Sequence, residues 1–206
     1  DSDSDYARTK GEGEAAVQKH MPGAVILRPS IMFGPEDDFF NRFAGMTRMG
    51  PVLPVVGAST RFQPVYVDDV AQAAEKAVKG EAAPGIYELG GPDVDTFKGL
   101  MQRMLKVIHR RRLVLNMPWF VARMMAWGFD MVQKVTFGLV TNGMLTRDQV
   151  KNLRRDNVVG EGVKGFAELG IKPVAMDAVL PEYLWRFRPS GQYDAIKASA
   201  RNLRQG

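Results

Sequence analysis

Two side chains near the start of the chain have the types and the spacing for proton transfer. Tyr6 and Lys10 stand four residues apart, in a stretch over residues 6–19 whose composition favours a helix. On a helix they share one face. A nearby ammonium favours phenolate over phenol, so Tyr6 would exchange a proton closer to neutral pH than the ordinary tyrosine pKa of about 10 allows. On spacing alone, a surface tyrosine stacked on the lysine stem is the better explanation.

Two further motifs follow, and their order adds specificity. Residues 24–35, reached through a turn at residues 21–23, predict a buried strand that ends in LRPSIMFGP. Residues 65–71, VYVDDVA, open another helix. This succession resembles the extended short-chain dehydrogenase/reductase superfamily, and its NAD-dependent epimerase/dehydratase group in particular. The residue sequences of the first two motifs are most similar to those of the atypical branch that includes NADPH-binding accessory subunits of respiratory complex I and their bacterial relatives.

The resemblance implies roles for particular residues. Tyr6 would be the general acid/base, and Lys10 would hold the nicotinamide ribose and lower the pKa of the tyrosine. The turn that faces the nicotinamide end of NAD or NADP would comprise Pro29, Ser30, Ile31 and Met32. Phe33 stands where many members have tyrosine, which keeps a ring but removes a hydroxyl.

Two polar residues of the next segment, Arg61 and Gln63, lie near the place where sugar-nucleotide enzymes put substrate ligands. The resemblance does not assign them that role firmly. A small-molecule substrate is expected, and the sequence does not identify it.

Alternating strand and helix patterns predict the fold class, an α/β protein that contains the C-terminal part of a Rossmann-type, doubly wound parallel sheet. Strands are expected over residues 61–67 and 85–91, and an extended loop over residues 51–57. Helices are expected after the acidic pair at 37–38, over 70–79 with Asp68 or Asp69 as the cap, and over 97–108 starting at Thr96.

The second half of the chain differs in composition, with more Met, Trp and basic residues, and predicts a smaller, mostly helical subdomain. We expect a Rossmann-type remainder over residues 1–110, the subdomain over 111–190 and a basic tail over 191–206. Residues 118–134 carry an apolar stripe at helical spacing, interrupted by charges, so they fall short of the roughly 20 apolar residues of a membrane span. The stripe comprises Phe120, Met124, Trp127 and Met131. We expect these side chains to be mostly buried with a basic rim; docking on a partner or a membrane surface is the alternative.

Charge is distributed unevenly and restricts the classes of partner. The first 97 residues hold 9 Lys and Arg against 15 Asp and Glu, whereas the remaining residues hold 19 against 8. The basic half could meet complex I subunits or an anionic membrane surface, but no helix-turn-helix or aromatic RNA motif accompanies it, so no nucleic acid is expected. There is no cysteine, and the two histidines lack metal-ligand spacing, so no metal site is expected. The expected location is cytoplasmic, or peripheral on the inner membrane.

A glycine pattern late in the chain formally matches the dinucleotide fingerprint Gly-x-Gly-x-x-Gly. It spans Gly160 to Gly165, but it lacks the strand before it and the full helix after it that the motif requires. A loop before a short helix over residues 166–172 is expected. In the resembled family the Gly-rich phosphate loop would precede Tyr6, so we expect the chain to be a fragment.

Two functions follow from these observations. The first is an NAD(P)-dependent oxidoreductase or epimerase in which Tyr6 and Lys10 form the acid/base pair during hydride transfer. The alternative is an accessory or assembly subunit of NADH:ubiquinone oxidoreductase that keeps the cofactor without catalysis. The resemblance to the family supports the cofactor more strongly than the reaction.

Overall fold

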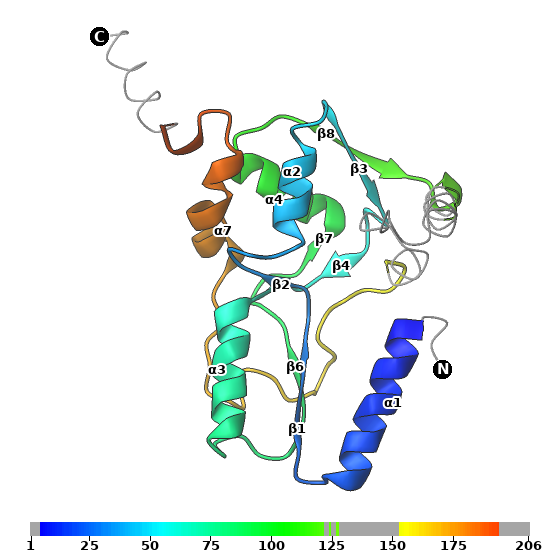
Figure 1. The fold of residues 1–206 in the computed structure, drawn as a ribbon, viewed down its shortest axis with the longest axis vertical. Coiled ribbons are helices and arrows are strands. Elements are labelled where there is room, and N and C mark those ends of the chain that lie inside the picture. Colours follow the sequence, from blue (N-terminus) through cyan, green and yellow to red (C-terminus); the bar gives the residue numbers. More distant parts are fainter. Residues whose placement is uncertain (1–4, 122–123, 125–126, 128–152, 194–206) are drawn as a thin grey trace, which may run out of the picture.

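Helices and strands alternate along most of the chain in the computed structural model (Figure 1). The structure describes residues 5–121, 124, 127 and 153–193, with the backbone alone for residues 5–7 and 192. The elements, in chain order, are α1 (Asp5–His20), β1 (Val25–Pro29), β2 (Met32–Phe33), α2 (Phe40–Met46), β3 (Val52–Val56), β4 (Arg61–Phe62), β5 (Val65–Tyr66), α3 (Val67–Val78), β6 (Gly85–Leu89), β7 (Asp95–Thr96), α4 (Phe97–Val107), β8 (Leu113–Met117), α7 (Met176–Leu184) and the 3₁₀ turns η1 (Trp185–Phe187) and η2 (Gly191–Tyr193).

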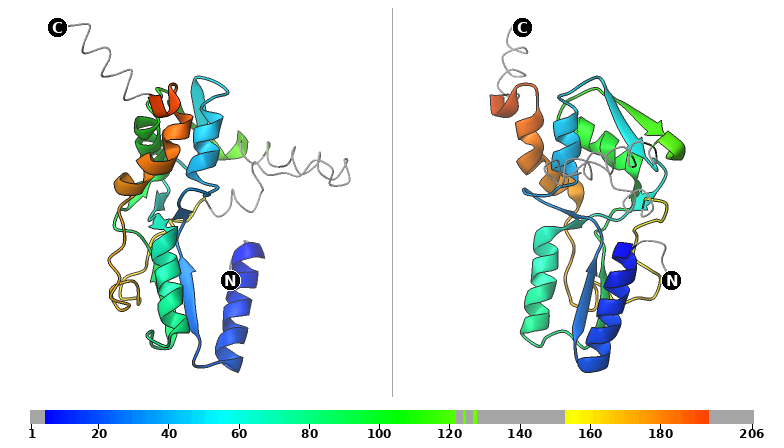
Figure 2. Two further views of the ribbon diagram at one scale, coloured as in Figure 1. Left: turned by 60° about the vertical axis from the view of Figure 1, so that its left-hand side comes forward. Right: turned by 45° about the vertical axis from the view of Figure 1, so that its right-hand side comes forward.

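Strands β1 and β6 form the part of the fold that follows the Rossmann pattern. They pair in parallel, from Val25 opposite Gly85 to Pro29 opposite Leu89. Helix α1 lies on one side of this pair and α3 on the other, as the views in Figures 1 and 2 agree. The predicted parallel pairing is therefore observed, with helices on both faces as in doubly wound sheets.

A small core stabilises this β1–β6 unit. It joins residues of β5, β6 and α3 with a turn segment from the distant residues 166–171, and its most deeply buried members are Val65, Ala73 and Leu89. Phe166 and Leu169 close it from the turn segment. The predicted helix over residues 166–172 is wrong, because hydrogen bonds from Leu169 and Ile171 back to the Phe166 carbonyl make turns rather than a helix.

A larger core lies at the other end of the molecule, between α2, α4, α7 and the inner face of β3. Its fully buried members include Phe40, Leu53, Leu100, Met104 and Leu180. The apolar 3–4 spacing after the acidic pair at 37–38 thus correctly predicted a core-facing helix, α2.

Strand β3 is a further difference from expectation. Residues 51–57 were expected to form a loop, but Val52–Val56 pairs in parallel with β8, with Val52 opposite Leu113 and Val56 opposite Met117. Two prolines in this stretch suggested a loop, and the partner strand lies too far along the chain to be anticipated locally. Residues 61–67 likewise form two short strands, β4 and β5, instead of one.

One of the two predicted helix caps is present, and the other is not. Thr96 caps α4 as expected, because its hydroxyl accepts a hydrogen bond from the Gly99 N–H at 3.1 Å. Helix α3, however, begins at Val67 after an extended Tyr66, and neither Asp68 nor Asp69 caps it. Asp69 is buried instead, and it accepts a 2.7 Å hydrogen bond from the Val174 N–H.

A partly buried carboxylate–phenol contact connects α7 to the turn that precedes α2. The Tyr183 hydroxyl donates to Asp37 Oδ2, and Asp37 also accepts from the Gly34 and Asn41 N–H groups. Burial, followed by the hydrogen bond to Asp37, raises the pKa of Tyr183 far above its usual range. Asp37 therefore organises the turn that leads into α2 and connects it to α7.

Removing this hydroxyl is expected to destabilise the fold. Tyr183→Phe should lower the free energy of unfolding by about 2 kcal/mol, the typical contribution of a hydrogen bond to a charged group. Because the folded-state pKa lies above the unfolded value of about 10, the contribution is fully present below about pH 10 and is lost progressively as pH rises from there toward the folded-state pKa. Urea unfolding at neutral and alkaline pH measures both effects. The exposed Tyr193 provides the control: Tyr193→Phe should change stability by less than about 0.5 kcal/mol.

Candidate functional site

The carboxyl end of β1 and the first turns of α1 meet at one edge of the β1–β6 pair. Helix α1 runs opposite to β1, so its amino-terminal end lies level with the point where β1 ends (Figures 1 and 2). Ligands of open α/β sheets bind outside the carboxyl ends of the strands. This edge is therefore the place where the candidate residues of both motifs would have to act together.

Arg28 holds α1 against the strands. Its Nε donates to Glu14 Oε1 and Oε2 at 3.1 and 3.0 Å, and its Nη1 donates to Glu88 Oε1 of β6 at 3.3 Å. The hydrogen bond that Arg28 donates to Glu14 is the main cause that raises the pKa of Arg28. Glu14 is half-buried, whereas the other residues of α1 from position 8 to position 20 are exposed. The contacts of Arg28 with Glu14 and Glu88, called the Arg28 clamp below, thus set the orientation of α1 about its own axis.

This clamp places the helical face that carries the predicted catalytic pair. Positions 6, 10 and 14 recur every four residues and so lie on one face of α1. Because Glu14 contacts Arg28 of β1, that face is turned toward the strand. Lys10 is exposed, and the side chain of Tyr6 lies outside the described residues. The proton-transfer pair therefore stays a prediction, supported by the placement of its backbone.

The predicted cofactor turn, residues 29–32, is held by three other parts of the chain. Ser30 donates its N–H to the Leu89 carbonyl at 2.9 Å and its hydroxyl to Asn157 Oδ1 at 2.9 Å. The Ile31 carbonyl accepts from the Val65 N–H at 2.9 Å. The backbone of the turn is thereby fixed to β6, to β5 and to a segment far along the chain.

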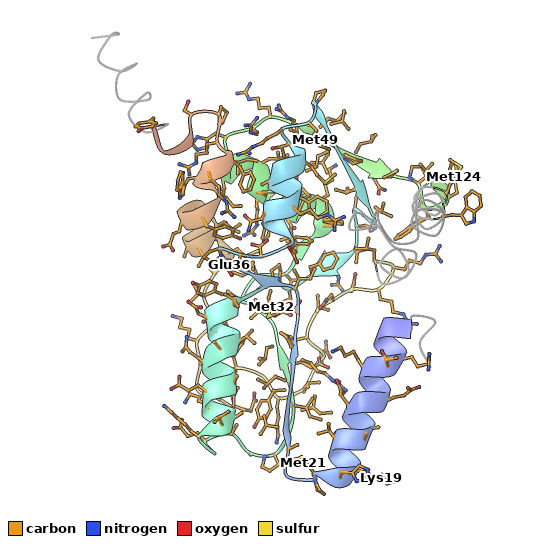
Figure 3. All side chains as sticks on the ribbon, in the orientation of Figure 1. Lys19, Met21, Met32, Glu36, Met49 and Met124 are labelled. Atoms are coloured by element: carbon orange, nitrogen blue, oxygen red, sulfur yellow. The ribbon has the colours of Figure 1, made fainter. Side chains whose placement is uncertain are left out.

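Two members of this turn remain exposed, Pro29 and Met32, and Figure 3 shows Met32 near the middle of the molecule where β2 begins. They offer an apolar surface beside the end of β1, and Lys10 contributes an exposed ammonium on the facing helix. An apolar platform and a cationic hydrogen-bond donor fit the nicotinamide and ribose end of a dinucleotide. When bound, such a cofactor supplies hydride chemistry, and these residues would hold and orient it.

Phe33, at the position where many family members have tyrosine, belongs to the core. It is fully buried, meets Phe40 edge-on at 6.3 Å between ring centroids and lies 5.6 Å from the Tyr66 ring. Its ring therefore anchors the turn at residues 29–32 to the core.

The two polar residues suspected as substrate ligands contact their own chain instead. The Arg61 Nε and N–H each donate to Asp156 at 2.8 Å, and this pairing lowers the pKa of Asp156. Gln63 donates to the Gly91 carbonyl at 2.8 Å and accepts from the Val159 N–H at 3.0 Å. Both side chains thus hold residues 156–159, which include Asn157, beside the edge of the site.

The late glycine motif packs beside β6 and does not form a phosphate loop. The Gly160 N–H donates to Glu88 Oε2 at 2.9 Å, and the Lys164 carbonyl accepts from the Glu88 N–H at 2.9 Å. The interpretation of residues 160–165 as a loop is confirmed, because turns and single bridges follow instead of a strand–helix unit.

Several residues that build the site were missed from the sequence. These are Glu14, Arg28, Glu88 and Asn157, which contact one another or the predicted turn over long sequence separations. Only Glu14 carried a local signal, since it continues the four-residue spacing of Tyr6 and Lys10. Among the described residues no cluster of acidic or histidine side chains could hold a metal ion.

Sequence comparison shows the family of the chain. Residues 3–116 match the RmlD substrate binding domain. A subunit named NADH dehydrogenase [ubiquinone] 1 alpha subcomplex subunit 9, mitochondrial, from Arabidopsis thaliana is 36% identical over 194 residues, covering 92% of this chain and 48% of the relative. The NADH-ubiquinone oxidoreductase 40 kDa subunit of Neurospora crassa is 27% identical over 205 residues, covering 99% of this chain and 52% of the relative. The chain thus spans about half the length of the curated relatives it matches.

Comparison with solved structures supports the fold that the sequence predicts. The dTDP-glucose 4,6-dehydratase of Bacillus anthracis, solved in complex with NAD, superposes with a TM-score of 0.61 at 15% identity, covering 93% of this chain and 55% of that enzyme. The predicted α/β, Rossmann-type fold class is therefore confirmed. The chain belongs to the RmlD substrate binding domain family.

Proposed function

We propose that this chain is part of a dinucleotide-binding accessory subunit of NADH:ubiquinone oxidoreductase, peripheral to the inner membrane. The observation that carries the proposal is the similarity to the Arabidopsis and Neurospora subunits, which extends over nearly the whole chain. Complex I subunits would be its partners, and NAD or NADP its cofactor.

The side chains around the site support a structural role for the cofactor. Arg61 and Gln63 are committed to Asp156, Gly91 and Val159 of their own chain, and the Phe33 ring is buried. These contacts give Arg61 and Gln63 a structural role within the chain. The edge that would contact the nicotinamide, in contrast, is rigidly built around Ser30 and the Arg28 clamp.

A second candidate is an oxidoreductase or epimerase that transfers a hydride at a carbinol or carbonyl carbon. It is favoured by the Tyr6 and Lys10 spacing on the helix face that Arg28 turns toward β1. In this reaction Tyr6 would give or take the proton at the substrate oxygen, and Lys10 would favour its phenolate.

Complementation of a gene deletion separates the two candidates. If the chain belongs to an accessory subunit, Tyr6→Phe should fully restore the NADH:ubiquinone oxidoreductase activity of membranes. The substitution removes a proton donor but leaves the Lys10 contact with the cofactor in place. Lys10→Met should lower the affinity of the complete protein for NAD(P) about tenfold or more, since it deletes a charge-assisted hydrogen bond. Restoration by Lys10→Met should be correspondingly incomplete. Lys19→Met, at the other end of the same helix, is the matched control and should behave as wild type.

The opposite results would favour catalysis. If Tyr6→Phe binds the cofactor normally but fails to restore function, a proton transfer is required and the accessory role is wrong. Normal assembly and activity of the oxidoreductase in the deletion strain would also contradict it.

A further inference from the structure

The β3–β8 ribbon carries apolar side chains on both of its faces. Side chains alternate along each strand, so Leu53 and Val55 enter the core while Val52 and Pro54 face outward. The outward partners of these two residues on β8 are Leu113 and Leu115. Exposed fractions are 40% for Val52, 64% for Leu113 and 51% for Leu115. A sheet face that meets only water normally alternates to polar residues, so this outer face has the composition of a contact surface.

A basic groove adjoins the apolar face at the start of β8. This hollow, of about 830 Å³, is lined by Gln102, Leu105, Lys106, His109, Arg110, Arg111, Arg112 and Leu113. Leu113 belongs to both features, so the apolar outer face and the basic groove form one continuous surface.

Two arginines of this groove donate hydrogen bonds to backbone carbonyls. Arg110 donates to the Phe187 carbonyl at 2.8 Å, and Arg112 donates to the Thr47 carbonyl at 2.9 Å. Within the described residues, no ion pair of the structure joins Lys106, Arg110, Arg111 or Arg112 to a carboxylate. Burial, together with the charges of Arg112 and Arg48, lowers the pKa of Arg110. Positive charge thus accumulates here without a carboxylate partner from the part of the chain that the structure describes.

The chain that follows β8 extends the apolar surface. Phe120, Met124 and Trp127 share a helical face through their spacing, and they are 64%, 63% and 52% exposed. Their predicted burial is therefore wrong, and Met131 lies outside the described residues. Figure 3 shows Met49 and Met124 at the β3–β8 end of the molecule, with Lys19 and Met21 at the opposite end.

We propose that the basic groove and the outer face of β3–β8 together dock on an anionic phospholipid bilayer. Phosphate headgroups would contact Lys106 and Arg111, while Leu113, Leu115 and Trp127 enter the headgroup boundary. Aliphatic and aromatic side chains beside Lys and Arg are the composition of surfaces that lie in this interfacial zone. No described helix is long and apolar enough to span a membrane, so the docking would be peripheral.

Charge also favours a bilayer over a second copy of the chain. A two-fold contact through this surface would place the same patch on both copies, and two unneutralised basic grooves would repel each other. A bilayer with anionic lipids instead presents many phosphates and an apolar layer at adjacent depths. This inference is independent of cofactor binding and does not require the proposed accessory role.

Vesicle binding by the complete protein tests the proposal. Sedimentation with vesicles of phosphatidylcholine mixed with phosphatidylglycerol should be strong at low salt and weaker at high salt, and vesicles of phosphatidylcholine alone should bind poorly. Lys106→Gln combined with Arg111→Gln should lower the affinity about 30-fold at low salt, because two exposed cations are removed. Leu113→Ser combined with Leu115→Ser should lower it about tenfold at both salt concentrations.

A matched control removes the same charge elsewhere. Lys19→Gln combined with Lys79→Gln, at the carboxyl ends of α1 and α3, should leave vesicle affinity unchanged. The proposal is overturned if neither lipid mixture binds, if neutral and anionic vesicles bind equally, or if the Lys106 and Arg111 variant binds like wild type. Salt-sensitive binding to polyglutamate without vesicle binding would assign the surface to an acidic protein, which also overturns it.

Discussion

Phe97→Ala is expected to lower the free energy of unfolding by about 4 kcal/mol, the usual cost of a large cavity in a core. Phe97 is 3% exposed and its ring lies 5.3 Å from Phe43, 5.6 Å from Phe39 and 5.7 Å from Phe62. Truncation removes every one of these contacts at once. It also loosens β4, whose residue Arg61 holds the segment beside the candidate site.

Urea unfolding of the complete protein measures this loss, and the chain offers a matched control. Phe120 is 64% exposed, so Phe120→Ala should change the free energy of unfolding by less than about 0.5 kcal/mol. Equal effects of the two substitutions would contradict the assignment of Phe97 to the core. Because Phe120 belongs to the proposed docking surface, its substitution should weaken vesicle binding while leaving stability intact.

Gly91→Ala is expected to cost about 3 kcal/mol or more, through overpacking against backbone. A Cβ at position 91 would lie 2.0 Å from the Pro64 carbonyl oxygen. Neither backbone can yield freely. The Gly91 carbonyl accepts a hydrogen bond from the Gln63 side chain. On either side of Pro64, the Gln63 N–H donates to the Asn157 carbonyl and the Val65 N–H donates to the Ile31 carbonyl. The substitution should therefore distort the same edge that carries the cofactor turn.

Gly13→Ala is the control for this substitution. A Cβ at position 13 would meet nothing within 4 Å, and the residue lies inside helix α1. Alanine there should raise stability by about 0.5–1 kcal/mol, because glycine loses more backbone entropy in a helix. A Gly91→Ala protein as stable as wild type by urea unfolding, with unchanged cofactor affinity, would show that the close approach to Pro64 is relaxed in solution.

The sequence alone determined those features whose cause is local. Helix α1, the Thr96 cap, the apolar face of α2 and strand β6 follow from spacing, capping chemistry and periodicity within a few residues. The ordered motifs of the first 71 residues were specific enough to indicate the family, which the match over residues 3–116 confirms.

The tertiary structure decided what depends on partners far along the chain. Strand β3 exists because β8 pairs with it, and Asp69 is buried because it binds the Val174 N–H, 105 residues away. The Arg28 clamp joins residues 14 and 60 positions apart, and no local pattern specifies such a charge network. Exposure of the Phe120 stripe was likewise undetermined, because helical spacing defines an apolar face without specifying what covers it. Local sequence fixes the conformation of a segment through its own backbone and caps, but burial and pairing are set by the elements that pack against it.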